Sequence, residues 1–152
     1  MFLGALRPDD WDFPLLVHVL GAMLLVGALC VVIVALVATW RMRETAEAAP
    51  LRRLAFQALL LGVVPSYVVM RIGGQWLASE ENLDESEPGW LQVGYVVADV
   101  SVLVLIAALV LAGLSVRRGA RGGPLGRAAA VLSIILLAAY LVAVWAMTAK
   151  PG

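Results

Sequence analysis

Residues 14–40 read PLLVHVLGAMLLVGALCVVIVALVATW, and this stretch contains no aspartate, glutamate, lysine or arginine. An α-helix rises about 1.5 Å per residue, and about 20 apolar residues cross the hydrocarbon core of a bilayer. The stretch is therefore long enough to span a membrane. Three further apolar stretches follow it. We predict four membrane-spanning helices, at about residues 14–40, 54–78, 91–116 and 125–149.

The composition supports a single membrane domain. Of the 152 residues, 62% are hydrophobic, whereas an ordinary soluble domain contains about 45–50% apolar residues. The connections between the apolar stretches are short, which predicts that neighbouring helices run antiparallel. The predicted fold class is all-α: an integral membrane four-helix antiparallel bundle that comprises residues 1–152.

The distribution of charge predicts how the bundle is oriented. Two of the three connections are rich in arginine: they contain Arg41, Arg43, Arg52 and Arg53, and Arg117, Arg118, Arg121 and Arg127. Acidic residues dominate the segment before the first helix and the connection at 79–88. Basic loops of plasma-membrane proteins remain in the cytoplasm. We therefore predict a multi-pass protein of the inner (plasma) membrane with cytoplasmic basic loops and with both termini outside.

Several classes of function find no support in the sequence. There is no glycine-rich phosphate loop and no nucleic-acid-binding patch, so nucleic acid is not an expected partner. The single cysteine, Cys30, excludes a disulfide within the chain. The acidic segment 79–88 matches no calcium loop, and no histidine or cysteine spacing indicates a metal site. No nucleophile–base pair stands out, so we predict no catalytic residue and favour a protein that is not an enzyme.

Three ionisable residues lie inside the predicted spans, and they are the candidates for a functional site. They are His18, Arg71 and Asp99. The helical rise places them about 6–8 Å, 10 Å and 12 Å from the outer ends of their helices. They therefore fall in one layer in the outer half of the bundle. Intramembrane ionisable residues are rare and commonly functional.

A charge that faces lipid is costly, so Arg71 and Asp99 are expected to point into the bundle and to form a buried ion pair. Other polar side chains of the same layer are expected to surround this pair. Gln75, Gln92 and Tyr95 extend it toward water, and Tyr67 and Tyr140 form its floor. The layer is interpreted either as a structural link between helices or as a vestibule in which His18 titrates or binds a ligand.

The second span contains three residues that disturb helices. Pro65 removes a backbone hydrogen bond in mid-membrane, and Gly73 and Gly74 follow Arg71. One interpretation is a kink or partial unwinding near Arg71. The alternative is ordinary tolerance of glycine and proline in membrane helices, with close helix packing at Gly73.

The segment Leu16-Val17-His18-Val19-Leu20-Gly21-Ala22, followed by Val26-Gly27, resembles the first helix of a bacterial group of four-span integral membrane proteins of unknown function. That group is loosely related to the copper-resistance CopD-like proteins. The ending at residues 145–151 looks like the actinobacterial variety of the group. The resemblance implies the four-span fold and carries over His18, but it implies no established activity. The chain lacks the several histidines and methionines expected of a copper conduit.

Three functions remain open from the sequence. The first is a non-enzymatic accessory or structural component, acting in a larger membrane complex or as a homo-oligomer within the lipid bilayer. The second is a small transporter or proton-linked sensor that uses Asp99. The third is an electron-transfer subunit that binds haem through His18 or a quinone in the outer layer. Because this chain has one histidine, Met70 or a second subunit would supply the other haem ligand.

Overall fold

The computed structural model describes residues 12–42, 47–80 and 89–149. Its helices are α1 (Asp12–Arg41), α2 (Ala48–Gln57), the π-helix η2 (Ala58–Val63), α3 (Val64–Glu80), α4 (Gly89–Arg117), the 3-10 turn η4 (Gly119–Gly122) and α5 (Gly123–Ala149). All regular structure in the described residues is helical. Because α2, η2 and α3 follow one another without a break, they form one long rod.

In the described residues, four helical rods are long and apolar enough to cross a membrane, as the sequence predicted. They are Asp12–Arg41, Ala48–Glu80, Gln92–Arg117 and Gly119–Ala149. The second rod begins six residues before the predicted boundary. The prediction that Arg52 and Arg53 lie in a loop is therefore wrong, because both belong to α2.

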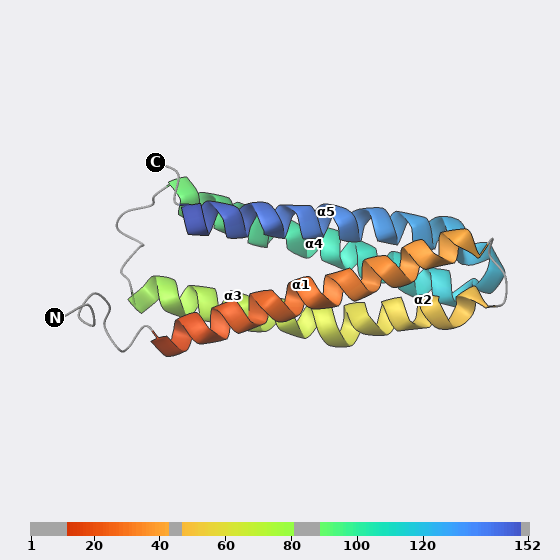
Figure 1. Ribbon diagram of the computed structural model, residues 1–152, viewed down its shortest axis with the longest axis horizontal. Helices are drawn as coiled ribbons and strands as arrows, with labels where there is room; N and C mark the ends of the chain where they lie inside the picture. The colour runs from red at the N-terminus through yellow and green to blue at the C-terminus, as the bar shows by residue number, and fades with distance from the viewer. Residues whose placement is uncertain (1–11, 43–46, 81–88, 150–152) are drawn as a thin grey trace.

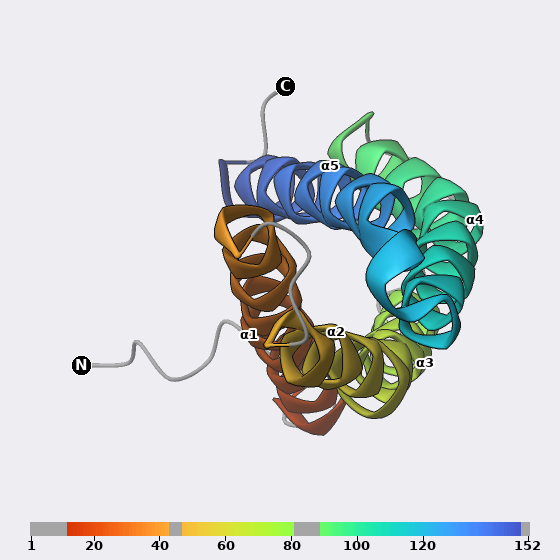
Figure 2. The same cartoon turned by 90° about the vertical axis from the view of Figure 1, so that its right-hand side faces the viewer.

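The four rods lie side by side as an elongated bundle (Figure 1). The start of α1, the end of α3, the start of α4 and the end of α5 lie together at one end. We call this end, which carries Asp12 and Glu80, the acidic end. We call the opposite end, which carries Arg41, Arg52 and Arg117, the arginine end. Figure 2, viewed along the bundle, shows the helices arranged in a ring.

Close approach of α1 and α3 fixes one side of this ring. A Cβ atom added to Gly21 would lie 2.6 Å from the backbone nitrogen of Met70. A Cβ atom on Gly73 would likewise lie 2.6 Å from the backbone nitrogen of His18. Small residues at membrane-helix crossings allow such contact between backbones. Gly73 is therefore a packing position, as the second of the two sequence interpretations held.

The irregular part of the second rod lies before Pro65, not at the glycines. In η2 the wider helix places the Val64 amide on the carbonyl of Leu59, five residues earlier. Proline cannot donate a backbone hydrogen bond, and a π-helical turn redistributes the neighbouring bonds. The α-helix then continues through Gly73 and Gly74. The unwinding suggested near Arg71 is therefore not observed.

The fully buried leucines and valines lie between the middle of the bundle and the arginine end. Fully buried leucines and valines from α1, α2–η2 and α5 meet there: Leu25, Leu29, Val32, Leu36, Leu59, Val63 and Leu136. In contrast, the outside of the bundle exposes large apolar side chains on every rod, including Met23, Leu61, Leu103 and Leu141. An apolar exterior of this extent is expected of a surface that contacts lipid.

The α1–α3 crossing can be tested by comparing Gly21→Ala with Gly27→Ala. Both replacements favour the α1 helix, since alanine has the higher helix propensity. Gly27 has open space around it, whereas Gly21 abuts the backbone of Met70. We expect Gly21→Ala to lower the free energy of unfolding by about 1–3 kcal/mol relative to Gly27→Ala. Unfolding in mixed detergent micelles measures the difference, and equal stability of the two variants would contradict the close crossing.

Candidate functional site

The side chains of Arg71 and Asp99 join α3 to α4. Nη2 of Arg71 donates a hydrogen bond to Oδ1 of Asp99, with 2.7 Å between the two atoms. The sequence predicted this contact. Its location differs from the prediction, because the Arg71 side chain is 29% exposed and that of Asp99 is 64% exposed.

The exposure follows from the position of each residue on its helix. On α3 the neighbouring Met70 and the following Gly73 face α1, so Arg71 lies at the edge of the buried face. On α4 the buried positions include Ala98 and Ser101, and Asp99 lies beside them. The expectation that both charges point into the bundle is therefore wrong. The pair lies on the outer surface of the bundle, at the seam between α3 and α4.

Tyr95 supports the pair from α4. The guanidinium carbon of Arg71 lies 5.5 Å from the centre of the Tyr95 ring. A guanidinium at this distance from an aromatic face is attracted by a cation–π interaction. Gln75, one helical turn from Arg71 toward the acidic end, is exposed. It extends the polar surface rather than closing over the pair.

The two tyrosines predicted at the floor of the site are buried, and each bonds a neighbouring helix. The Tyr67 hydroxyl donates to the backbone carbonyl of Ala98, at 2.9 Å. The Tyr140 hydroxyl lies 2.6 Å from the Ser101 hydroxyl. The Ser101 hydroxyl also bonds the Ala98 carbonyl, at 2.9 Å. Sequence analysis missed Ser101, although it lies only two residues after Asp99.

His18 is joined to α3 and not to the ion pair. Its Nδ1 atom lies 2.8 Å from the backbone carbonyl of Met70. A carbonyl only accepts hydrogen bonds, so Nδ1 carries the proton and, in the neutral ring, Nε2 carries the lone pair. The imidazole packs against Gly74, where an added Cβ would lie 3.0 Å from Nδ1. A Cβ at position 74 would therefore require the imidazole to move by a few tenths of an ångström.

These contacts form a continuous series across the bundle. His18 links α1 to α3, Tyr67 and Arg71 link α3 to α4, and Ser101 links α4 to Tyr140 of α5. Most of the predicted site residues are thus committed to bonds between helices. Among residues 12–42, 47–80 and 89–149, no three His, Cys, Asp or Glu side chains come together as a metal site would require.

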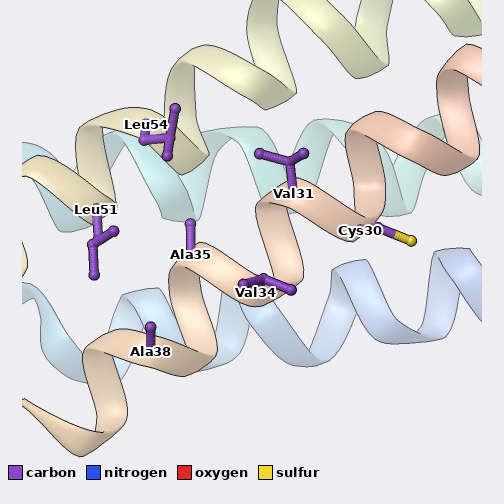
Figure 3. Close-up of a pocket in the computed structure, with 7 residues that line it drawn as sticks. All are labelled: Cys30, Val31, Val34, Ala35, Ala38, Leu51 and Leu54. Carbon is purple, nitrogen blue, oxygen red and sulfur yellow. The ribbon is translucent and has the colours of Figure 1, made fainter.

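A groove between α1 and α2 offers space but no polar chemistry. Its lining residues are Cys30, Val31, Val34, Ala35, Ala38, Leu51 and Leu54 (Figure 3). Apart from the weakly polar thiol of Cys30, these side chains are hydrocarbon. The groove suits a hydrocarbon chain, and it shares no residue with the polar site.

A further polar contact between helices lies at the arginine end, and the sequence did not predict it. The Arg52 side chain is only 3% exposed, and its Nη1 atom donates a hydrogen bond to the carbonyl of Gly119. Gly119 has a φ of 55°, a left-handed conformation that glycine adopts readily. Arg52 therefore holds the turn between α4 and α5 onto α2. In the sequence it is indistinguishable from its neighbour Arg53.

Arg52 and Arg53 provide a matched pair for testing this contact. Each variant to alanine removes one arginine from the same end of the same helix, but Arg53 is exposed. We expect Arg52→Ala to lower the free energy of unfolding by about 1.5–3 kcal/mol, because a charged hydrogen bond is lost. Arg53→Ala should change it by less than about 0.5 kcal/mol. Equal effects, measured by unfolding in detergent micelles, would rule out a special role for Arg52.

The fold and these contacts define the class of the protein: a multi-pass α-helical membrane bundle. Comparisons with models of protein families, with curated proteins and with solved structures found no match. The resemblance of the first helix to the four-span bacterial group therefore stays a prediction.

Proposed function

We propose that this chain is a non-enzymatic component of a membrane assembly, embedded in the plasma membrane as an antiparallel four-helix bundle. The charge distribution supports an orientation with the arginine end in the cytoplasm and both termini outside. Arg41, Arg53, Arg117, Arg118 and Arg121 are exposed at the arginine end, whereas Asp12 and Glu80 lie at the other. Arginines near the ends of membrane spans favour the cytoplasmic side.

The observation that carries the assembly role is the exposure of the Arg71–Asp99 pair. Arg71 lies five residues before Trp76, or about 7.5 Å deeper along the helix. Tryptophan is enriched at the membrane interface, so the pair lies below the headgroups. Around it, Ile72 and Leu103 present apolar side chains. A charged side chain in contact with hydrocarbon costs at least about 2.5 kcal/mol, so a protein surface that covers the pair stabilises the bundle.

Transport finds less support than assembly. The other polar side chains of the outer half already bond neighbouring helices, as His18, Tyr67 and Tyr140 do. The core toward the arginine end consists mainly of packed leucine and valine side chains such as Leu29 and Leu36. The buried hydroxyls of Thr39 and Ser133 bond carbonyls of their own helices. A path for protons or ions would need polar groups through this region.

Native mass spectrometry of the protein released from its own membranes in mild detergent tests the proposal. We expect the chain to be recovered together with at least one further protein chain. Asp99→Asn should weaken this assembly at least about tenfold, because it leaves Arg71 without its charged partner. Glu47→Gln removes an exposed carboxylate at the arginine end and serves as the control.

Two outcomes would contradict the assembly role. One is recovery of the single chain alone under the mildest conditions that extract it. The other is proton flux in liposomes that the isolated chain supports and Asp99→Asn abolishes, since that result would assign Asp99 to transport.

A cofactor role for His18 is the second candidate, and one contact favours it. The Nδ1 atom of His18 is bonded to the carbonyl of Met70. Histidines that ligate metals commonly donate their other ring nitrogen to a carbonyl in this way. The Nε2 atom of His18 would then hold a haem iron, and another chain would supply the other ligand.

The visible absorption spectrum of the protein purified from its own membranes tests this candidate. If His18 ligates haem, the spectrum shows a Soret band that His18→Ala removes and Tyr95→Phe retains. Tyr95 lies against Arg71 on the other side of α3 and is a suitable control. A spectrum without a Soret band, or a band unaffected by His18→Ala, would contradict haem ligation by His18.

A further inference from the structure

The Arg71–Asp99 pair is part of a continuous exposed stripe on α4. Its residues follow one another at alternating spacings of four and three: Gln92, Val96, Asp99, Leu103, Ile106 and Val110. All six are exposed. This is the heptad spacing by which one helix packs along another in a left-handed pair. We call these six residues, together with Arg71 of α3, the α4 face.

The heptad spacing alone does not identify a partner surface. On α1, residues Leu16, Leu20, Met23, Gly27, Cys30 and Val34 follow the same spacing and are also exposed. The side chains of that stripe are apolar, so lipid hydrocarbon can cover them without cost. The α4 face differs because it contains a charged pair, and charged groups are costly in contact with lipid. A protein surface is therefore needed on α4 and not on α1.

We infer that the α4 face is the contact between two copies of this chain, related by a twofold axis parallel to the helices. The inference rests on the assembly role proposed above and names the partner. It requires no second gene product, because the α4 face is complementary to itself.

The complementarity follows from the arrangement of the two charges. Arg71 and Asp99 lie side by side on neighbouring helices and at the same depth, since their side chains are in contact. A twofold axis that runs parallel to the helices, beside the exposed pair, relates it to the same pair in the second copy by a rotation of 180°. Around the axis the four charges then follow the order positive, negative, positive, negative. Each arginine thus lies between its own Asp99 and that of the second copy.

The apolar positions of the stripe suit the same packing. Leu103 and Ile106 lie one and two turns from Asp99 toward the arginine end, so the same twofold axis brings their apolar side chains against the second copy. A polar residue at one heptad position fixes the register of such helix pairs. Asp99 and Gln92, seven residues apart, occupy equivalent positions. Sliding one copy along the other would bring these polar groups against apolar side chains.

A charge exchange within one chain tests the inference. The double variant Arg71→Asp/Asp99→Arg keeps the opposite charges within each chain, so two copies of the variant can pair as two unchanged copies do. In a mixed pair, however, the order around the axis becomes positive, negative, negative, positive. Like charges placed against each other disfavour association at an interface.

The two forms are co-expressed with different affinity tags, and each tag is used to capture its partner from mild detergent. We expect unchanged chains to capture unchanged chains and variant chains to capture variant chains. Capture of mixed pairs should fall at least about tenfold below random association. Mixed pairs as frequent as like pairs would overturn the inference.

Cysteine cross-linking provides a second test that does not depend on the exchanged charges. In a Cys30→Ser background, Leu103→Cys lies on the α4 face and Met23→Cys lies on the apolar stripe of α1. The native residues are exposed to nearly the same extent, Leu103 at 70% and Met23 at 69%. Oxidation in native membranes should form disulfide-linked dimers through position 103 and at least about tenfold fewer through position 23. Equal yields at the two positions would overturn the inference.

These results also separate the inference from the proposed function. Native mass spectra that show the chain bound to a different protein, without self-association, would overturn the twofold pair and leave the assembly role intact. A single chain alone would overturn both.

Discussion

The close crossing of α1 and α3 is the constraint on which the rest of the bundle depends. Gly21 and Gly73 let the two backbones approach so closely that a Cβ at either position would lie 2.6 Å from a backbone nitrogen of the other helix. This approach brings the imidazole of His18 to the carbonyl of Met70. Because Met70 and Gly73 face α1, the adjacent Arg71 is turned toward α4, where it meets Asp99. One backbone contact thus determines where the charged side chains lie.

Different contacts predominate in the two halves of the bundle, although Arg52 also bonds the Gly119 carbonyl at the arginine end. Toward the arginine end, leucine and valine side chains pack without exposed surface, as at Leu29 and Leu36. Toward the acidic end, the contacts between helices include hydrogen bonds from His18, Tyr67 and Tyr140. Lipid provides little hydrophobic drive for helix association, so close packing and hydrogen bonds must hold the helices together. The polar bonds also give the half toward the acidic end a defined register.

Much of the fold could be predicted because a bilayer imposes strong rules on sequence. Apolar length predicted all four spans, since a membrane-crossing helix must satisfy its backbone internally and must be apolar outside. The meeting of Arg71 and Asp99 could also be predicted, because two charges at similar depth have few alternatives to pairing. The burial of Arg52, in contrast, could not be predicted from the sequence. Its burial beneath the turn at Gly119 depends on where α2 begins and on the path between α4 and α5.

The sequence by itself determined the membrane class, the number of spans and the residues that must find polar partners, because these follow from local hydropathy and helix length. Only the tertiary structure decided which partners they found. It assigned His18 to a backbone carbonyl, joined Tyr140 to the unpredicted Ser101, and placed Asp99 on the outer surface. The physical reason is that the direction of a side chain depends on the rotation of its helix about its own axis. That rotation is set by contacts between helices distant in sequence, such as Gly21 against Met70.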